Sequence, residues 1–74
     1  MIYQAVFERA DDGSVWAYVP DLPGCTSLGA TIDEAQINVA EAARLWIEDA
    51  HAKGEALPAS TTIAALAIEI DPAA

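Results

Sequence analysis

One long amphipathic helix is the strongest constraint that this sequence places on its fold. Thr31 has the character of an N-cap, because Glu34 follows three residues later as in a capping box. Gly54 stands where a left-handed C-cap belongs, so the sequence predicts a helix from about Ile32 to Lys53. The apolar residues on one face of this helix are Ile32, Ala35, Val39, Ala42, Ala43, Trp46, Ile47 and Ala50. In a chain of 74 residues this face needs a sheet to pack on.

Two strands joined by a tight turn are predicted before the helix. The ranges 2–8 (IYQAVFE) and 14–19 (SVWAYV) are rich in β-branched and aromatic residues, and the intervening ADDG has turn chemistry. Alternation places Val15, Ala17 and Val19 on one face of the second strand and Trp16 and Tyr18 on the other. Neither face is plainly polar, so we expect both to be covered.

A stiff corner, VPDLPGCTSLG over residues 19–29, follows the second strand. Pro20 ends the strand ladder, and Pro23 with Gly24 fits the two central positions of a type II turn. The chain should then re-enter the sheet at Cys25. Two interpretations remain open: the corner is purely architectural, or an exposed tip at Asp21 and Leu22 binds a partner.

The C-terminal run TTIAALAIEI, residues 61–70, is predicted to form a last strand, although its alanines would also suit a helix. Leu66, Ile68 and Ile70 would share one face of that strand. The predicted fold class is therefore α+β, with the order β-β-β-α-β. It consists of a three- to four-stranded, mainly antiparallel sheet with one long helix packed on one face, in a single domain spanning residues 1–74.

Charge and hydrophobicity narrow the classes of partner. Twelve acidic residues against three basic ones give a formal net charge of −9, so phosphate backbones will be repelled. The acidity either keeps a small hydrophobic domain soluble or steers it toward a basic protein. Because 54% of the residues are apolar, surplus apolar surface should be buried between subunits of a homo-oligomer. Ile37 and Leu45 lie among glutamates on the far side of the helix, either as isolated surface residues or as contact points.

No group of residues has the pattern of an active site. His51 has no second histidine, and Cys25 has no cysteine partner and should be a buried, inert thiol. Turn formation explains Asp11 with Asp12, and helix capping explains Asp33 with Glu34, better than a metal site does. We expect no enzyme activity, no metal and no cofactor.

The single cysteine and the absence of a leader at the N-terminus favour the cytoplasm. No apolar run approaches the roughly 20 residues of a membrane span, so we expect no membrane role.

Two stretches together resemble the HicB family of antitoxins: AVFERADDGSVWAYVPDLPGC and GATIDEAQINVAEAARLWIEDAHAKGEALP. The resemblance covers roughly residues 3–58. It implies a fold similar to a partial ribonuclease H domain, without nuclease activity and in dimers or tetramers. It also implies a HicA-type toxin as partner, a small basic protein that cleaves messenger RNA and that the antitoxin blocks by occupying its RNA-binding surface.

Many HicB antitoxins carry a further C-terminal DNA-binding module, whereas this sequence ends at Ala74. We therefore expect no direct nucleic-acid binding. The alternative function is an orphan HicB-like binding or scaffold domain with no toxin. The candidate partner contacts are Asp11, Asp12, Asp21, Leu22, Glu34, Glu41 and Glu48. The candidate oligomer contacts are Trp16, Tyr18, Ile37 and Leu45.

Overall fold

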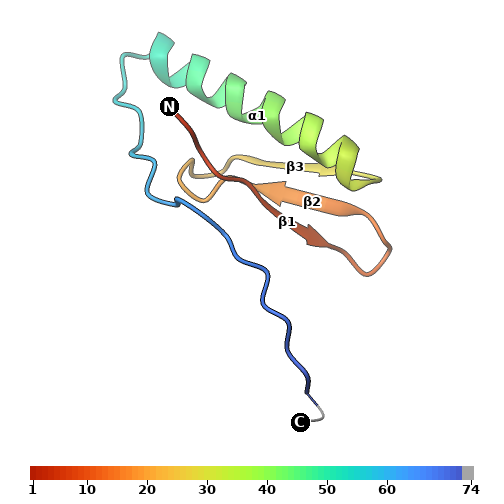
Figure 1. The fold of residues 1–74 in the computed structure, drawn as a ribbon. Helices are drawn as coiled ribbons and strands as arrows, with labels where there is room; N and C mark the ends of the chain where they lie inside the picture. The colour runs from red at the N-terminus through yellow and green to blue at the C-terminus, as the bar shows by residue number, and fades with distance from the viewer. Residues whose placement is uncertain (73–74) are drawn as a thin grey trace.

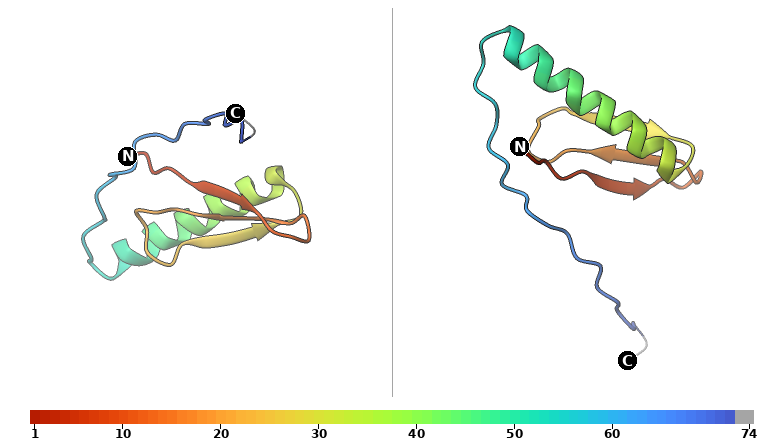
Figure 2. Two further views of the ribbon diagram at one scale, coloured as in Figure 1. Left: turned by 90° about the horizontal axis from the view of Figure 1, so that it is seen from below. Right: turned by 45° about the horizontal axis from the view of Figure 1, so that its top comes forward.

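A computed structural model, which describes residues 1–72, consists of a three-stranded antiparallel sheet and one helix (Figure 1). The elements are β1 (Val6–Arg9), β2 (Val15–Tyr18), β3 (Thr26–Gly29) and α1 (Ile32–Ala52). The strands lie in the order β1-β2-β3, and α1 covers one face of the sheet (Figure 2). The predicted α+β class and the order of these four elements are confirmed.

The register of the sheet confirms the predicted faces of the strands. Phe7 pairs with Ala17, and Ala17 pairs with Ser27, so these three residues lie in one row across the sheet. Ala17 is fully buried, whereas Trp16 and Tyr18 on the opposite face of β2 are only half-buried. The helix therefore covers the face that carries Val15, Ala17 and Val19, and within the single chain the opposite face is not covered.

Both ends of α1 form as the sequence predicts. The Thr31 hydroxyl accepts a hydrogen bond from the Glu34 amide at 3.2 Å, and the Glu34 carboxylate accepts one from the Ala30 amide at 3.3 Å. Gly54 has a φ of +72°, as a left-handed C-cap requires. The helix ends at Ala52, one residue before the predicted end.

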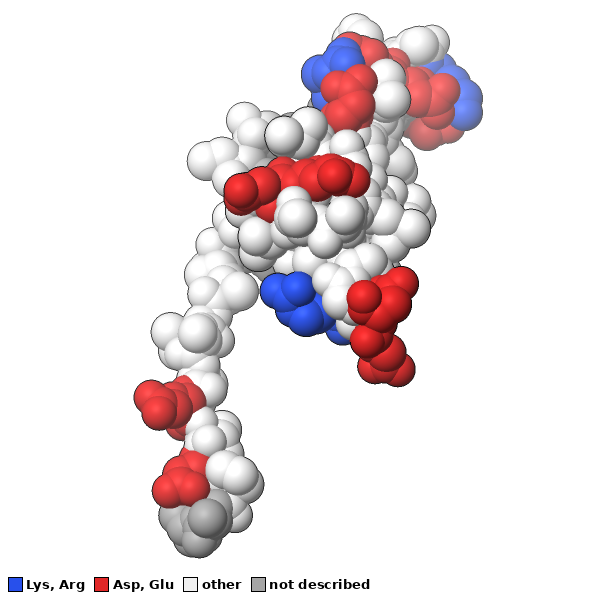
Figure 3. Space-filling view, turned by 90° about the vertical axis from the view of Figure 1, so that its right-hand side faces the viewer, with Lys and Arg blue, Asp and Glu red and all other residues white. Residues whose placement is uncertain are grey.

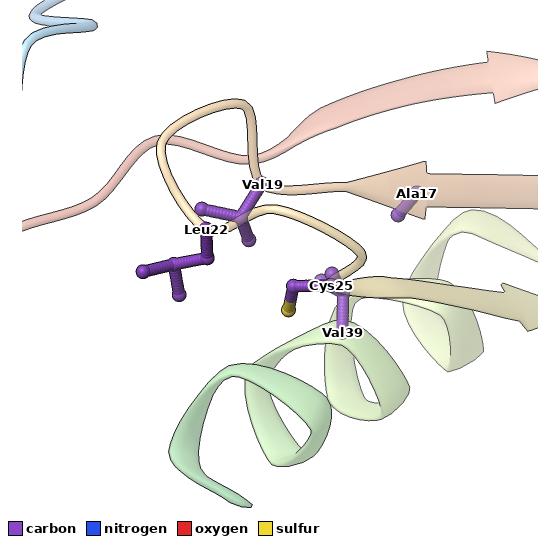
Figure 4. Close-up of a cluster of buried hydrophobic side chains, with 5 residues drawn as sticks. All are labelled: Ala17, Val19, Leu22, Cys25 and Val39. Atoms are coloured by element: carbon purple, nitrogen blue, oxygen red, sulfur yellow. The ribbon is translucent and has the colours of Figure 1, made fainter. Parts of the chain in front are cut away.

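The core lies between α1 and the helix-facing side of the sheet, around β2 and the corner of residues 19–29. Its buried members are Ala17, Val19, Leu22, Cys25 and Val39 (Figure 4). Gly29 brings the end of β3 close to the helix, since a Cβ atom there would lie 2.4 Å from the Ala35 amide nitrogen. Most of the predicted apolar face of α1 packs on this core, but Ile32 at its start remains 47% exposed.

The predicted fourth strand is not formed. Residues 59–70 are extended, but they form no ladder with any strand in the described part of the chain. Extended backbone without a neighbouring strand lacks ladder partners for its amide and carbonyl groups and buries few of its side chains. Ile68 and Ile70 are accordingly 70% and 73% exposed. The sheet ends at three strands in the single chain.

Candidate functional site

Several of the predicted partner contacts gather at one end of the domain. The turn between β1 and β2 lies at the same end as the start of α1, which brings Asp11 and Asp12 to the end that Glu34 occupies (Figure 1). The Asp12 carboxylate accepts hydrogen bonds from the Ser14 hydroxyl and amide at 2.6 and 2.9 Å, which hold its pKa below the usual value. Asp11 makes no side-chain hydrogen bond or ion pair within residues 1–72. These three acids form what we call the acidic end.

Two other predicted contacts, Glu41 and Glu48, are joined by a cation on the exposed side of α1. The Arg44 guanidinium contacts Glu41 at 2.5 Å and Glu48 at 2.7 Å. Its hydrogen bond to Glu41 lowers the pKa of that carboxyl and raises the pKa of Arg44. The three side chains together keep a single negative charge, so they form a weaker electrostatic surface than the sequence suggests.

The remaining acidic side chains are dispersed over the molecule. Figure 3 shows them in separate groups, including two on the extended C-terminal segment, with no single acidic face in that view. Lys53 pairs with Asp49 at 2.9 Å. Two of the three cations, Arg44 and Lys53, are thus paired with acidic side chains of α1. The excess negative charge is spread over the domain and is not concentrated on one face.

The corner between β2 and β3 is closed by three backbone hydrogen bonds. The Val19 amide donates to Cys25 O, the Leu22 amide to Val19 O and the Cys25 amide to Leu22 O, each at 3.0 Å. Gly24 has a φ of +78°, which confirms the type II turn predicted at Pro23 and Gly24. The corner therefore has an architectural role, with its backbone closed on itself by hydrogen bonds.

The prediction that Leu22 is exposed at a tip is wrong. Leu22 is only 1% exposed and is the largest fully buried side chain of the core. The two successive turns fold its side chain back toward α1, as Figure 4 shows. Trp46 links the helix to the corner, since its indole Nε1 donates to Pro23 O at 2.9 Å. Leu22 is a core residue and is no longer a candidate contact.

Asp21, the other residue of the predicted tip, connects the corner to the C-terminal segment. Its carboxylate accepts hydrogen bonds from the Thr61 hydroxyl at 2.6 Å, the Thr61 amide at 2.9 Å and the Thr62 amide at 2.9 Å. These bonds, with the Thr61 hydroxyl first, hold the pKa of Asp21 below its usual value. The sequence gives no sign of this contact, because Asp21 and Thr61 lie 40 residues apart in the chain.

The face of the sheet opposite α1 carries aromatic and apolar side chains. The rings of Trp16 and Tyr18 lie 5.3 Å apart, and Leu28 is 66% exposed. An open hollow of about 390 Å³ is lined by Trp16, Thr26, Ser27 and Leu28. We call this surface the outer sheet face.

The candidate oligomer contacts are divided between two surfaces. Trp16 and Tyr18 belong to the outer sheet face, whereas Ile37 and Leu45 are 71% and 50% exposed on α1. The helix lies on the other side of the sheet (Figure 2). No single contact between two flat surfaces can use all four residues.

Cys25, the single thiol of the chain, lies in the core. Burial raises the pKa of the Cys25 thiol, which makes it a poor nucleophile. Within residues 1–72 there is no group of three or more histidine, cysteine or acidic side chains that could hold a metal ion. In the same part of the chain, α1 is too polar to cross a membrane.

Comparison with known proteins gives one family and several relatives. The model of a family described as the HicB-like antitoxin of bacterial toxin–antitoxin systems matches residues 3–73. The chain is 43% identical over 63 residues to an uncharacterized protein from the rep-hol intergenic region of Haemophilus phage HP1, covering 85% of this chain and 47% of that protein. It is 42% identical over 45 residues to a UPF0150 protein of Synechocystis, covering 61% of this chain and 62% of that protein.

A third relative is matched over more of its length. The chain is 40% identical over 58 residues to a UPF0150 protein of Thermoplasma acidophilum, covering 78% of this chain and 84% of that protein. The chain thus spans about half of the phage protein and just under two thirds of the Synechocystis one. No solved structure matches the chain significantly.

Proposed function

This chain belongs to the HicB-like antitoxin family of bacterial toxin–antitoxin systems, and from that premise we propose that it binds a small basic HicA-type toxin and neutralises it by covering its RNA-binding surface. In this proposal the protein acts in the cytoplasm as a homo-oligomer, binds no nucleic acid itself and catalyses no reaction. The observation that carries the proposal is the family match over residues 3–73.

The charge of the chain supports a basic partner. A net charge of −9 attracts a protein whose own surface has evolved to bind RNA, and the same charge disfavours contact with RNA. Asp12 and Glu41 have lowered pKa values, so both stay ionised well below neutral pH. The attraction should therefore persist throughout the physiological range and weaken with added salt.

We assign the toxin contact to the acidic end together with the exposed side of α1. Asp11 has no intramolecular partner in the described chain, so its charge is fully available to a cation of the toxin. Glu34 is in the first turn of α1, and that end of the helix lies at the same end of the domain as the turn between β1 and β2 (Figure 1). Glu41 and Glu48 extend this surface along the helix, where Ile37 adds an exposed apolar contact. Asp21 is at the opposite end and serves the C-terminal segment instead.

We assign the homo-oligomer to the sheet side of the domain. The outer sheet face leaves Trp16, Tyr18 and Leu28 uncovered in the single chain, and aromatic residues are typical anchors of interfaces. Using the sheet side for self-association leaves α1 and the acidic end free for the toxin.

The test is inhibition of RNA cleavage by the HicA-type protein encoded beside this chain, together with a binding titration. We expect stoichiometric inhibition and a sub-micromolar dissociation constant. Asp11→Lys should weaken binding at least tenfold at low salt. Glu55→Lys is the matched control, because it changes the net charge equally at the far end of α1 and should weaken binding much less.

The same experiment separates the proposal from its alternative. If neither the neighbouring protein nor several other HicA-type toxins bind the chain or slow down, the antitoxin proposal fails. The orphan scaffold would then be the better account, and the hollow of about 390 Å³ on the outer sheet face would be the place to look for a small ligand.

A further inference from the structure

The C-terminal segment, residues 63–70, leaves the domain as an extended chain with its apolar side chains in solvent (Figures 1 and 2). Ile63 and Leu66 are 85% and 83% exposed, and Ile68 and Ile70 differ little from them. Leu66, Ile68 and Ile70 alternate, so they form one row along one side of an extended chain. The radius of gyration is 14.6 Å, whereas a compact chain of this length would have about 11 Å. The segment has the pattern of a strand but lacks a sheet.

β1 provides a vacant edge for such a strand. Its one edge pairs with β2, and the other edge pairs with no strand in the described chain. The helix packs mainly on β3 and then on β2, which leaves the helix-facing side of β1 partly open. A hollow of about 240 Å³ lies there, lined by Phe7, Glu8, Arg9, Val15 and Ile32. An apolar row placed along β1 would fill this hollow and cover Ile32.

The attachment of the segment disfavours its own β1 edge. Tyr3 donates a hydrogen bond to Pro58 O and Ser60 donates one to Ile2 O, which holds the chain just before the segment beside the residues that precede β1. From there the segment leads away in the same general direction as its own β1 and forms no ladder with it (Figure 1). Parallel pairing is slightly less stable per residue than antiparallel pairing, and every other pair in this sheet is antiparallel. A second copy related by a twofold axis presents its β1 in the antiparallel direction.

We propose that residues 63–70 form the exchanged strand of a twofold homodimer, in which each copy adds this segment antiparallel to β1 of the other and fills the hollow lined by Phe7 and Ile32. The inference depends on the homo-oligomer of the proposed function and specifies its interface. The exchanged strand lies at the edge of the outer sheet face, which it would extend. The reciprocal arrangement satisfies both free edges at once.

The buried area agrees with a second copy as the occupant. Burying a Leu or Ile side chain removes on the order of 100 Å² of apolar surface from water. The three side chains of the row in each copy, with the partner surface they cover, give on the order of 1,200 Å², at the lower end of the usual range for a specific interface.

The first experiment compares two equally exposed isoleucines. Ile68→Asp changes the segment, and Ile37→Asp makes the same change on α1, where the residue is 71% exposed against 70% for Ile68. Light scattering should give the wild type twice the chain mass of 7.8 kDa. Ile68→Asp should weaken association at least tenfold, and Ile37→Asp should leave it within twofold.

The outcomes distinguish the inference from the rest of the proposal. A wild-type dimer that Ile68→Asp leaves unchanged overturns the exchanged strand but not the homo-oligomer, and a monomeric wild type overturns both. Toxin inhibition is measured separately and can hold in each case.

A second experiment locates the contact directly. A photoreactive residue at position 68 should cross-link to residues 6–9 of a second copy when isotope-labelled and unlabelled chains are mixed. Cross-links confined to one copy would show a fourth strand in its own sheet and would overturn the exchange.

Discussion

Replacing Leu22 by alanine should cost this domain a large share of its stability. Leu22 is 1% exposed in the core, and Leu to Ala substitutions at such sites cost about 2–5 kcal/mol, depending on how well the site collapses. Three backbone hydrogen bonds and the flanking prolines hold the corner in place, so little collapse is possible. We therefore expect about 3–5 kcal/mol, the upper part of that range. A domain of this length has a total stability of only about 4–11 kcal/mol.

The assay is urea unfolding followed by tryptophan fluorescence and far-UV circular dichroism. Wild type and variant are compared at one chain concentration, because self-association would add to the apparent stability. Ile37→Ala is the control, since Ile37 is 71% exposed and its replacement should change stability by no more than about 0.5 kcal/mol. A loss below about 1 kcal/mol for Leu22→Ala, with an unchanged slope, would refute the placement of Leu22 in the core.

Three further predictions concern other contacts. Gly29→Ala should destabilise the domain by about 1–3 kcal/mol in the same urea titration, because its Cβ would lie 2.4 Å from the Ala35 amide nitrogen; an unchanged midpoint would contradict that close approach. The pKa of Asp21 is lowered in the folded chain, so its contribution is complete above the ordinary value of 3.8 and is lost as the pH falls through the folded value. Asp21→Asn should therefore flatten the acid side of the stability profile and speed amide exchange at Thr61, and equal profiles would count against the contact. Thr31→Ala should cost about 1 kcal/mol through loss of the N-cap, measured by thermal melting, and no change in melting temperature would show that the cap is dispensable.

Local features of this sequence were sufficient to predict the parts of the fold that depend on neighbouring residues. The capped ends of α1, the hairpin and the type II turn at Pro23 and Gly24 each depend on side chains within a few positions of one another. The alternation of β2 also separated Ala17 and its neighbours from Trp16 and Tyr18, but it did not show which of the two faces the helix covers. The predicted and observed elements agree because short stretches of sequence contain the helix period, the strand period and the turn residues.

Features that depend on distant contacts were mispredicted or missed. Leu22 looked exposed because turns usually are, whereas two consecutive turns direct it into the core. The residues 61–70 have a strand pattern, but a pattern cannot show whether a sheet edge is available beside it. The link from Asp21 to Thr61 spans 40 residues and leaves no sequence signal. Charge counting likewise missed that Arg44 neutralises much of the acidic side of α1.

The buried position of Cys25 makes the protein its own reporter of opening. Cys25 is the single cysteine of the chain and is only 4% exposed, so a thiol reagent can reach it only when the corner separates from α1. The rate of labelling under native conditions therefore measures how often this end of the core opens. A partner that stabilises the folded chain would slow that rate, so the rate of labelling also reports association without an engineered cysteine.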